Sequence, residues 1–165
     1  LSGGAITLAG GAVRIERGSL IAADDLTITP ASGAIVAAAA TLRAGGVLAR
    51  GATGTLNLTN TTVEAASASL AVAAGDLSVS GGSVTAAGPL AIVARDVVLG
   101  AATIGAGGAV TITAARTLAM SDTGLSGQSV DVSAAAGAAI SRGSMTAAAA
   151  LGVASGGDLP LSGTD

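Results

Sequence analysis

The chain has 165 residues and a net charge of −3, and half of its residues are hydrophobic, yet it contains no aromatic residue, cysteine, histidine or lysine. Without cysteine or histidine, zinc and most transition-metal sites are excluded, as are Ser/His/Asp and Cys/His catalytic sets. The seven arginines and ten acids are scattered, which argues against a nucleic-acid partner, because nucleic-acid binding needs clustered basic residues.

A four-residue phrase recurs along the chain: serine or threonine, an apolar residue, any residue, and alanine. The six regular copies begin at Ser19, Thr41, Thr62, Ser83, Thr103 and Ser144, and a degenerate copy begins at Gly124. Consecutive copies are roughly 20–22 residues apart, at the short end of the periods found in repeat proteins. A constant period of this length predicts a repeat architecture in which each unit stacks on the next.

Each period carries two further apolar pairs. The first are Ile6/Leu8, Leu26/Ile28, Leu48, Leu70/Val72, Leu90/Ile92, Val110/Ile112, Val130/Val132 and Leu151/Val153. The second are Val13/Ile15, Ile35, Leu56/Leu58, Leu77/Val79, Val97/Leu99, Leu118/Met120, Ile140 and Leu159/Leu161. Alternation of apolar with polar or small residues indicates a strand with one buried face. We therefore expect three short strands in each unit.

Two alanine runs, 37–40 and 147–150, favour helix on intrinsic propensity. Their place in the repeat puts them at strand ends and turns instead. The stretch Val97–Ala115 carries no charge and approaches the length of a membrane-spanning helix, but its apolar residues alternate, so we do not expect such a helix there.

These patterns predict an all-β fold, a parallel β-helix of about eight coils with three strands in each coil. Residues 1–165 are expected to form a single segment of this solenoid. Neither terminus has the polar cap with which solenoids cover their end strands. We therefore expect the segment to be a slice of a longer repeat protein.

The repeats Ser69–Gly88 and Pro89–Gly108 resemble those of filamentous haemagglutinin-type proteins, the adhesins and contact-dependent toxin carriers of the two-partner secretion route in Gram-negative bacteria. The resemblance covers nearly the whole chain. It implies a right-handed parallel β-helix with small aliphatic residues inside. It also implies an extracellular location at the bacterial surface and export through an outer-membrane transporter.

An acidic column is the strongest candidate for a site. Asp76, Asp96 and Asp158 each directly precede the first apolar position of the second strand. Asp76 and Asp96 fall in consecutive coils, so they are expected about 5 Å apart, the carboxylate separation of a retaining glycosidase. The favoured alternative is a set of solvated turn residues, with Arg116 pairing with Asp96 and with Thr117 interrupting the column.

The hydroxyls of the repeated phrase are the second candidate. A flat array of them could bind ice or a polysaccharide, but such a face needs regular outward threonines. The outward positions of the first strand are expected to be Thr7, Thr27, Ala49, Ala71, Ala91, Thr111, Asp131 and Gly152, which is irregular. We favour a ladder in which the hydroxyls bond one another and the turn backbone.

Other motifs lack what their chemistry requires. Asp24–Asp25 and Ser155–Gly163 do not contain the tandem Gly-Gly-x-Gly-x-Asp repeat that binds calcium. Gly105–Val110 is glycine-rich but has no lysine and opens no helix, so it is not a phosphate loop. We expect no catalytic, cofactor-binding or metal-ligating residue.

The expected function is therefore non-enzymatic: a structural or adhesive shaft of a secreted bacterial surface filament. Its expected partners are neighbouring repeats of the same long chain, stacked copies of itself, and a host or neighbouring cell surface. The alternative is a β-helical carbohydrate-active enzyme, or a module that binds ice or polysaccharide.

Overall fold

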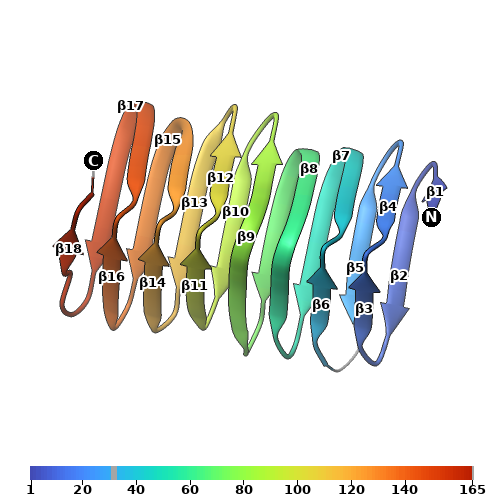
Figure 1. Ribbon diagram of the computed structural model, residues 1–165, viewed down its shortest axis with the longest axis horizontal. Coiled ribbons are helices and arrows are strands. Elements are labelled where there is room, and N and C mark those ends of the chain that lie inside the picture. Colours follow the sequence, from blue (N-terminus) through green and yellow to red (C-terminus); the bar gives the residue numbers. More distant parts are fainter. Residues whose placement is uncertain (31–32, 165) are drawn as a thin grey trace.

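The computed structural model describes residues 1–30 and 33–164, except for the side chains of residues 49, 50 and 52. It contains 18 strands and no helix in this part of the chain. The strands run across the long axis and are stacked along it from one end of the molecule to the other, with the two termini at opposite ends (Figure 1). The strands are β1 (Ser2–Gly3), β2 (Ile6–Gly10), β3 (Val13–Glu16), β4 (Ser19–Ala22), β5 (Leu26–Pro30), β6 (Ile35–Ala38), β7 (Thr41–Ala52), β8 (Leu56–Val72), β9 (Asp76–Ala86), β10 (Leu90–Ala94), β11 (Asp96–Gly100), β12 (Thr103–Ala106), β13 (Ala109–Ala114), β14 (Thr117–Ser121), β15 (Gly124–Ala134), β16 (Gly137–Ser141), β17 (Ser144–Ser155) and β18 (Leu161–Ser162).

All pairings are parallel, and the strands of the interior coils bond their equivalents one coil before and one coil after. The chain therefore forms a β-solenoid, as expected, with about seven turns. The prediction of about eight coils is slightly too high, because β1 and β18 are two-residue strands in incomplete terminal turns. Strands such as β8 are long because the ladder continues around the corners of the coil.

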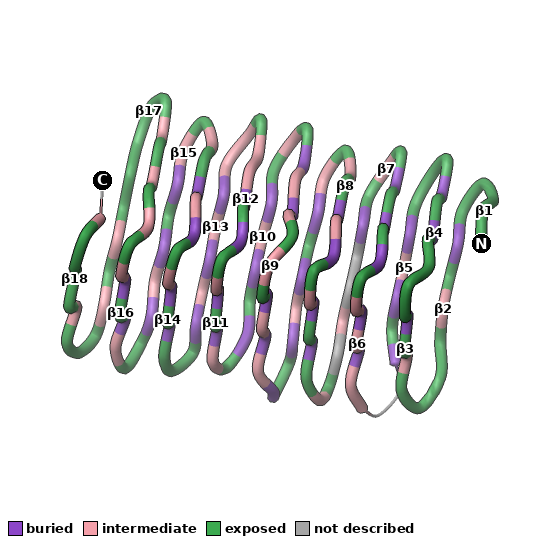
Figure 2. Tube along the Cα trace, viewed as in Figure 1, coloured by how far each residue is buried: buried purple, intermediate pink, exposed green. Residues whose placement is uncertain are grey.

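The core is a set of inward aliphatic columns, and inward and outward residues alternate along the strands (Figure 2). The repeated phrase aligns as predicted: its apolar residue faces inward and its fourth residue is usually a buried or half-buried alanine. The column at this apolar position contains Leu20, Leu42, Val63, Val84, Ile104 and Leu125, all at most 7% exposed. Such stacked aliphatic columns need no aromatic side chain.

The second-strand pairs are also confirmed, and alanines complete them. Ala37 pairs with Leu58 and Ala138 pairs with Leu118, in positions where the sequence shows only one large apolar residue per coil. Both alanines are buried. Neither alanine run forms a helix: Ala37 and Ala38 end β6, Ala39 lies at the left-handed corner that follows, and residues 147–150 lie within β17, since inward burial and the ladder outweigh helix propensity.

One first-strand pair is displaced by two residues relative to its neighbours. Leu70 and Val72 are both buried, as predicted, but Leu70 is in register with Ile92 and Ala68 with Leu90, so the equivalent of Leu90/Ile92 in this coil is Ala68/Leu70. The preceding corner is one residue shorter, because Ala65 precedes Ala68 by three positions whereas Ala44 precedes its equivalent, Leu48, by four. The outward residue between the pair is consequently Ser69, not Ala71.

The corner between the second and third strands has a left-handed backbone in every coil. Its residues are Arg17, Ala39, Asn60, Gly81, Ala101, Asp122, Arg142 and Gly163, with φ between 47° and 70°. The residue that follows each left-handed position in the sequence is small or polar. Two of these residues, Thr61 and Thr123, point inward and are both at most 1% exposed. The Oγ1 of Thr61 donates to the carbonyl of Ala37 at 3.0 Å, so this buried hydroxyl has a partner.

Candidate functional site

The acidic column forms where the sequence placed it. Asp76 and Asp96 are register partners at the starts of β9 and β11. Because adjacent parallel strands lie about 4.8 Å apart, the two carboxylates stand side by side on the surface. Thr117 occupies the same position in the next coil, at the start of β14.

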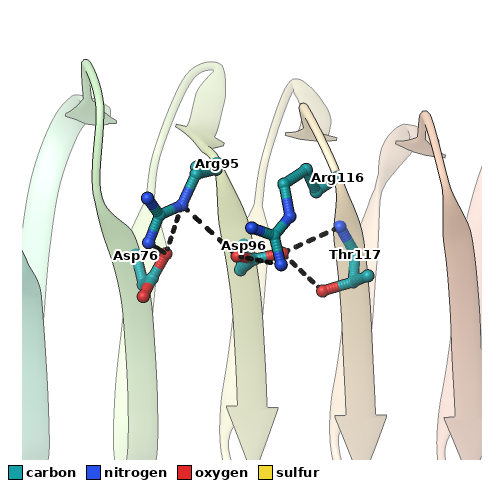
Figure 3. Close-up of polar contacts among 5 residues, drawn as sticks. All are labelled: Asp76, Arg95, Asp96, Arg116 and Thr117. Carbon is teal, nitrogen blue, oxygen red and sulfur yellow. Dashed lines mark hydrogen bonds and ion pairs between the residues drawn. The ribbon is translucent and has the colours of Figure 1, made fainter.

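Arginines directly preceding two of these positions connect the column (Figure 3). The Nη2 of Arg95 donates to Asp76 Oδ1 at 2.8 Å, and its Nε lies 3.4 Å from Asp96 Oδ2. The Nη2 of Arg116 lies 3.5 Å from Asp96 Oδ2, which confirms the predicted ion pair. Asp96 Oδ1 also accepts from the hydroxyl of Thr117 at 2.5 Å and from its backbone N–H at 3.1 Å. The column is a surface ladder of alternating charges.

This environment favours the ionised carboxylate of Asp96. The hydrogen bond from the Thr117 hydroxyl is the largest cause that lowers the pKa of Asp96, and Arg116 and Arg95 lower it further. The same ladder raises the pKa of Arg95, chiefly through its hydrogen bond to Asp76. A retaining glycosidase needs one carboxyl with a raised pKa to act as the acid, and Asp96 is shifted in the opposite direction.

Asp158 does not join the pair. It lies two coils beyond Thr117, and the intervening coil has Gly137 at the equivalent position. The backbone carbonyl of Asp158 accepts from Ala138 N at 3.0 Å, and from Ser155 Oγ at 3.1 Å. Asp158 is thus a turn residue, as the alternative interpretation predicted.

The repeated hydroxyls stand in one column on the third strand, where Ser19 pairs with Thr41, Thr62 with Ser83, and Gly124 with Ser144. The expected hydrogen-bonded ladder does not form, because these side chains are exposed or half-exposed and make no hydrogen bond with another described residue. Hydroxyls from other columns bond the backbone instead, such as Thr85 to Val63 O at 3.2 Å and Thr123 to Ser121 O at 2.9 Å.

The outward neighbours of this hydroxyl column are on the third strand, not on the first strand as expected. They are Ile21, Arg43, Glu64, Thr85, Gly105, Ser126 and Thr146. This set is also irregular, and it includes an ion pair between Arg43 and Glu64 at 3.5 Å. Of the first-strand outward positions, the side chain of Ala49 lies outside the described residues.

The remaining motifs form turns. Asp25 Oδ1 accepts from Val47 N at 2.7 Å, which fastens one corner to the next coil. Among the described residues, no group of three or more acidic side chains is placed to hold a metal ion. Gly105–Val110 passes from β12 into β13 without a helix.

An ion pair that the sequence analysis did not predict joins Arg142 and Asp122. Arg142 Nε donates to Asp122 Oδ1 at 2.9 Å, between two consecutive left-handed corners. This hydrogen bond is the main cause that lowers the pKa of Asp122 and raises that of Arg142. The two residues are one period apart in the sequence, and that spacing was the available signal.

No family model matches this chain, and no curated protein and no solved structure matches it either. In the described part of the chain, no helix is long and apolar enough to cross a membrane.

Proposed function

We propose that this chain is a length of non-enzymatic shaft in a secreted bacterial surface filament, with a structural or adhesive role. The observation that carries the proposal is the parallel pairing of equivalent strands, which continues the inward columns from coil to coil along the rod. The resemblance of its repeats to filamentous haemagglutinin-type proteins supports the extracellular location and export by two-partner secretion.

The geometry suits a spacer. Each coil adds about 4.8 Å along the axis, so about seven turns make roughly 35 Å of shaft. The ladder hydrogen bonds between coils lie nearly parallel to this axis. The Asp76–Arg95, Asp96–Arg116 and Asp122–Arg142 contacts add ion pairs between consecutive coils, which supports a stabilising role for these charges.

The proposed partners at the two ends are further coils, from the same long chain or from a stacked copy. At the amino-terminal end, a groove of about 550 Å³ is lined in part by Leu1, Leu8, Val13 and Leu20. At the other end, Leu151 and Leu161 are 51% and 53% exposed. Another coil in the same register would bury these side chains and pair the open strand edges. The adhesive role would add a host or neighbouring cell surface as a partner along the sides.

The proposal is tested on the cells that produce this chain. Antibody raised against the purified chain should label intact cells, and immunoelectron microscopy should place the label along extended surface filaments. Labelling that requires permeabilised cells would overturn the proposal. A glycan depolymerisation assay that compares the parent with Asp76→Asn and Asp96→Asn is the control for enzyme function, and activity lost in both variants would favour the alternative.

A further inference from the structure

Both asparagines of the chain lie in the motif Asn-x-Thr. They are Asn57, followed by Leu58 and Thr59, and Asn60, followed by Thr61 and Thr62. Serine and threonine account for 33 of the 165 residues, so composition alone makes two such matches improbable. Asn-x-Ser/Thr is the acceptor motif for transfer of a sugar to the asparagine amide, provided that the site is exposed.

Both side chains meet the requirement for exposure. Asn57 faces outward on β8, and Asn60 lies at the left-handed corner that follows, with a φ of 47°. Asparagine tolerates this conformation better than most residues. Asn60 stands in the corner column between Ala39 and Gly81, so neither neighbouring coil presents a large side chain beside it.

The carboxamide of Asn57 is held by its own motif. Thr59 Oγ1 donates to Asn57 Oδ1 at 3.1 Å. This bond fixes the orientation of the amide through its oxygen. Among the described residues, the Nδ2 atoms of Asn57 and Asn60 make no hydrogen bond, and both residues are exposed, so no hydrogen bond has to break before either nitrogen reacts.

A groove beside Asn60 offers space for a sugar. It has a volume of about 500 Å³ and is lined by Glu16, Arg17, Ala38, Ala39, Thr59 and Asn60. The groove is open to solvent, and Glu16 and Arg17 in its lining carry groups that can accept from and donate to sugar hydroxyls.

From these observations we infer that Asn57 and Asn60 are acceptors for N-linked glycosylation. The Nδ2 of the asparagine attacks the anomeric carbon of a sugar activated as a nucleoside diphosphate or lipid diphosphate ester. A nitrogen–carbon bond forms, the carbon–oxygen bond to the diphosphate breaks, and the diphosphate leaves with the electron pair. The proton from Nδ2 passes to a base of the glycosyltransferase. The inference goes beyond the shaft proposal and does not depend on it.

The test is mass spectrometry of the chain purified from the cells that make it, with peptide fragmentation across residues 55–64. We expect a sugar mass increase on Asn57 and on Asn60. One sugar at a time indicates a nucleotide-linked donor, whereas a complete oligosaccharide indicates a lipid-linked donor. An unmodified asparagine in this material overturns the inference for that site.

Variants separate motif recognition from folding. Thr59→Val and Thr62→Val keep the side-chain shape and should abolish the increase at Asn57 and Asn60, respectively, whereas Thr59→Ser and Thr62→Ser should retain it. Asn60→Gly suits the left-handed corner, so it should keep the thermal midpoint while losing the sugar at that site. Modification that persists at the parent level in both valine variants would contradict recognition of the motif.

Discussion

The middle and the last coil of this solenoid contain equivalent residues in different environments. Leu99 and Leu161 occupy the same second-strand column, yet Leu99 is fully buried whereas Leu161 is 53% exposed. Leu99 has a register partner on each side, Val79 and Met120, whereas Leu161 pairs only with Ile140 in the described residues. Burial therefore depends on having a coil above and below, and stability is the sum of contacts between neighbours.

The largest effect is expected when a charge is placed in the middle of the stack. Val84→Asp buries a carboxylate without a partner at a fully buried position, which costs several kcal/mol and should unfold the neighbouring coils. Far-UV circular dichroism and thermal melting measure this loss. Met145→Asp, in the half-buried equivalent of the last long strand, is the matched control with a smaller effect. If Val84→Asp melts like the parent, the inward register is wrong.

Truncating the two leucines compares the coils directly. Leu99→Ala leaves a cavity between two covered layers and should lower the free energy of unfolding by about 2–5 kcal/mol. Leu161→Ala removes a side chain that is half in solvent and should cost less than about 1 kcal/mol. Urea titration of both variants gives the difference, and equal losses would refute the dependence on neighbours.

The backbone strain of a non-glycine residue at a left-handed corner should not depend on the position of the coil in the stack. Ala101 has a φ of 49°, and this conformation costs a non-glycine residue about 1–2 kcal/mol. Ala101→Gly should therefore stabilise the chain by up to about 1 kcal/mol, because the relief of strain is partly offset by the larger entropy that glycine loses on folding.

Ala39→Gly, at the same corner near the amino-terminal end with a φ of 49°, should give the same gain in thermal midpoint. Ala102→Gly, at the buried neighbour, is the control and should destabilise. A loss of thermal stability in both corner variants would contradict the strain argument.

The smallest effect is expected from the ion pairs on the surface. The pKa of Asp96 is lowered in the folded chain, mainly by the Thr117 hydroxyl, so its contribution to stability is present above the ordinary carboxyl pKa of about 4. It is lost as the pH falls through the lowered value. Asp96→Asn should therefore reduce the drop in thermal midpoint between neutral and acidic pH.

Asp122→Asn near the carboxyl-terminal end is the comparison, because the pKa of Asp122 is lowered by Arg142. If the thermal midpoint of Asp96→Asn falls with pH as much as that of the parent, the contacts of Asp96 contribute nothing to the pH dependence of stability. Equal profiles in the two variants would show that the number of partners of each carboxylate is unimportant.

Side-chain size explains which parts of the fold were predictable. The third strand was aligned correctly because its apolar residue and alanine recur in nearly every unit. The first strand was misaligned at Leu70 because the residue equivalent to Leu90 is an alanine, Ala68. In a sequence rich in alanine, one alanine does not indicate a buried position. The left-handed corner has no common residue type, as Arg17, Ala39 and Asp122 illustrate.

The candidate site was predictable only in part. The positions of Asp76 and Asp96 followed from the period alone, since a constant repeat turns sequence spacing into spatial alignment. Two other features depend on the directions of side chains at the corners: Arg95 connects the two aspartates, and the repeated hydroxyls make no ladder. These directions cannot be predicted from the length of the repeat.

The sequence by itself determined the repeat, the alternation and therefore the parallel solenoid, because strand-like alternation inside a short, constant repeat admits few other packings. Only the tertiary structure decided the register at the short corner before Ala68, the left-handed backbone at Asn60, and the depth to which each residue is buried. These features depend on contacts between coils, because a corner absorbs one residue more or less while the strands on both sides of it stay paired with their equivalents.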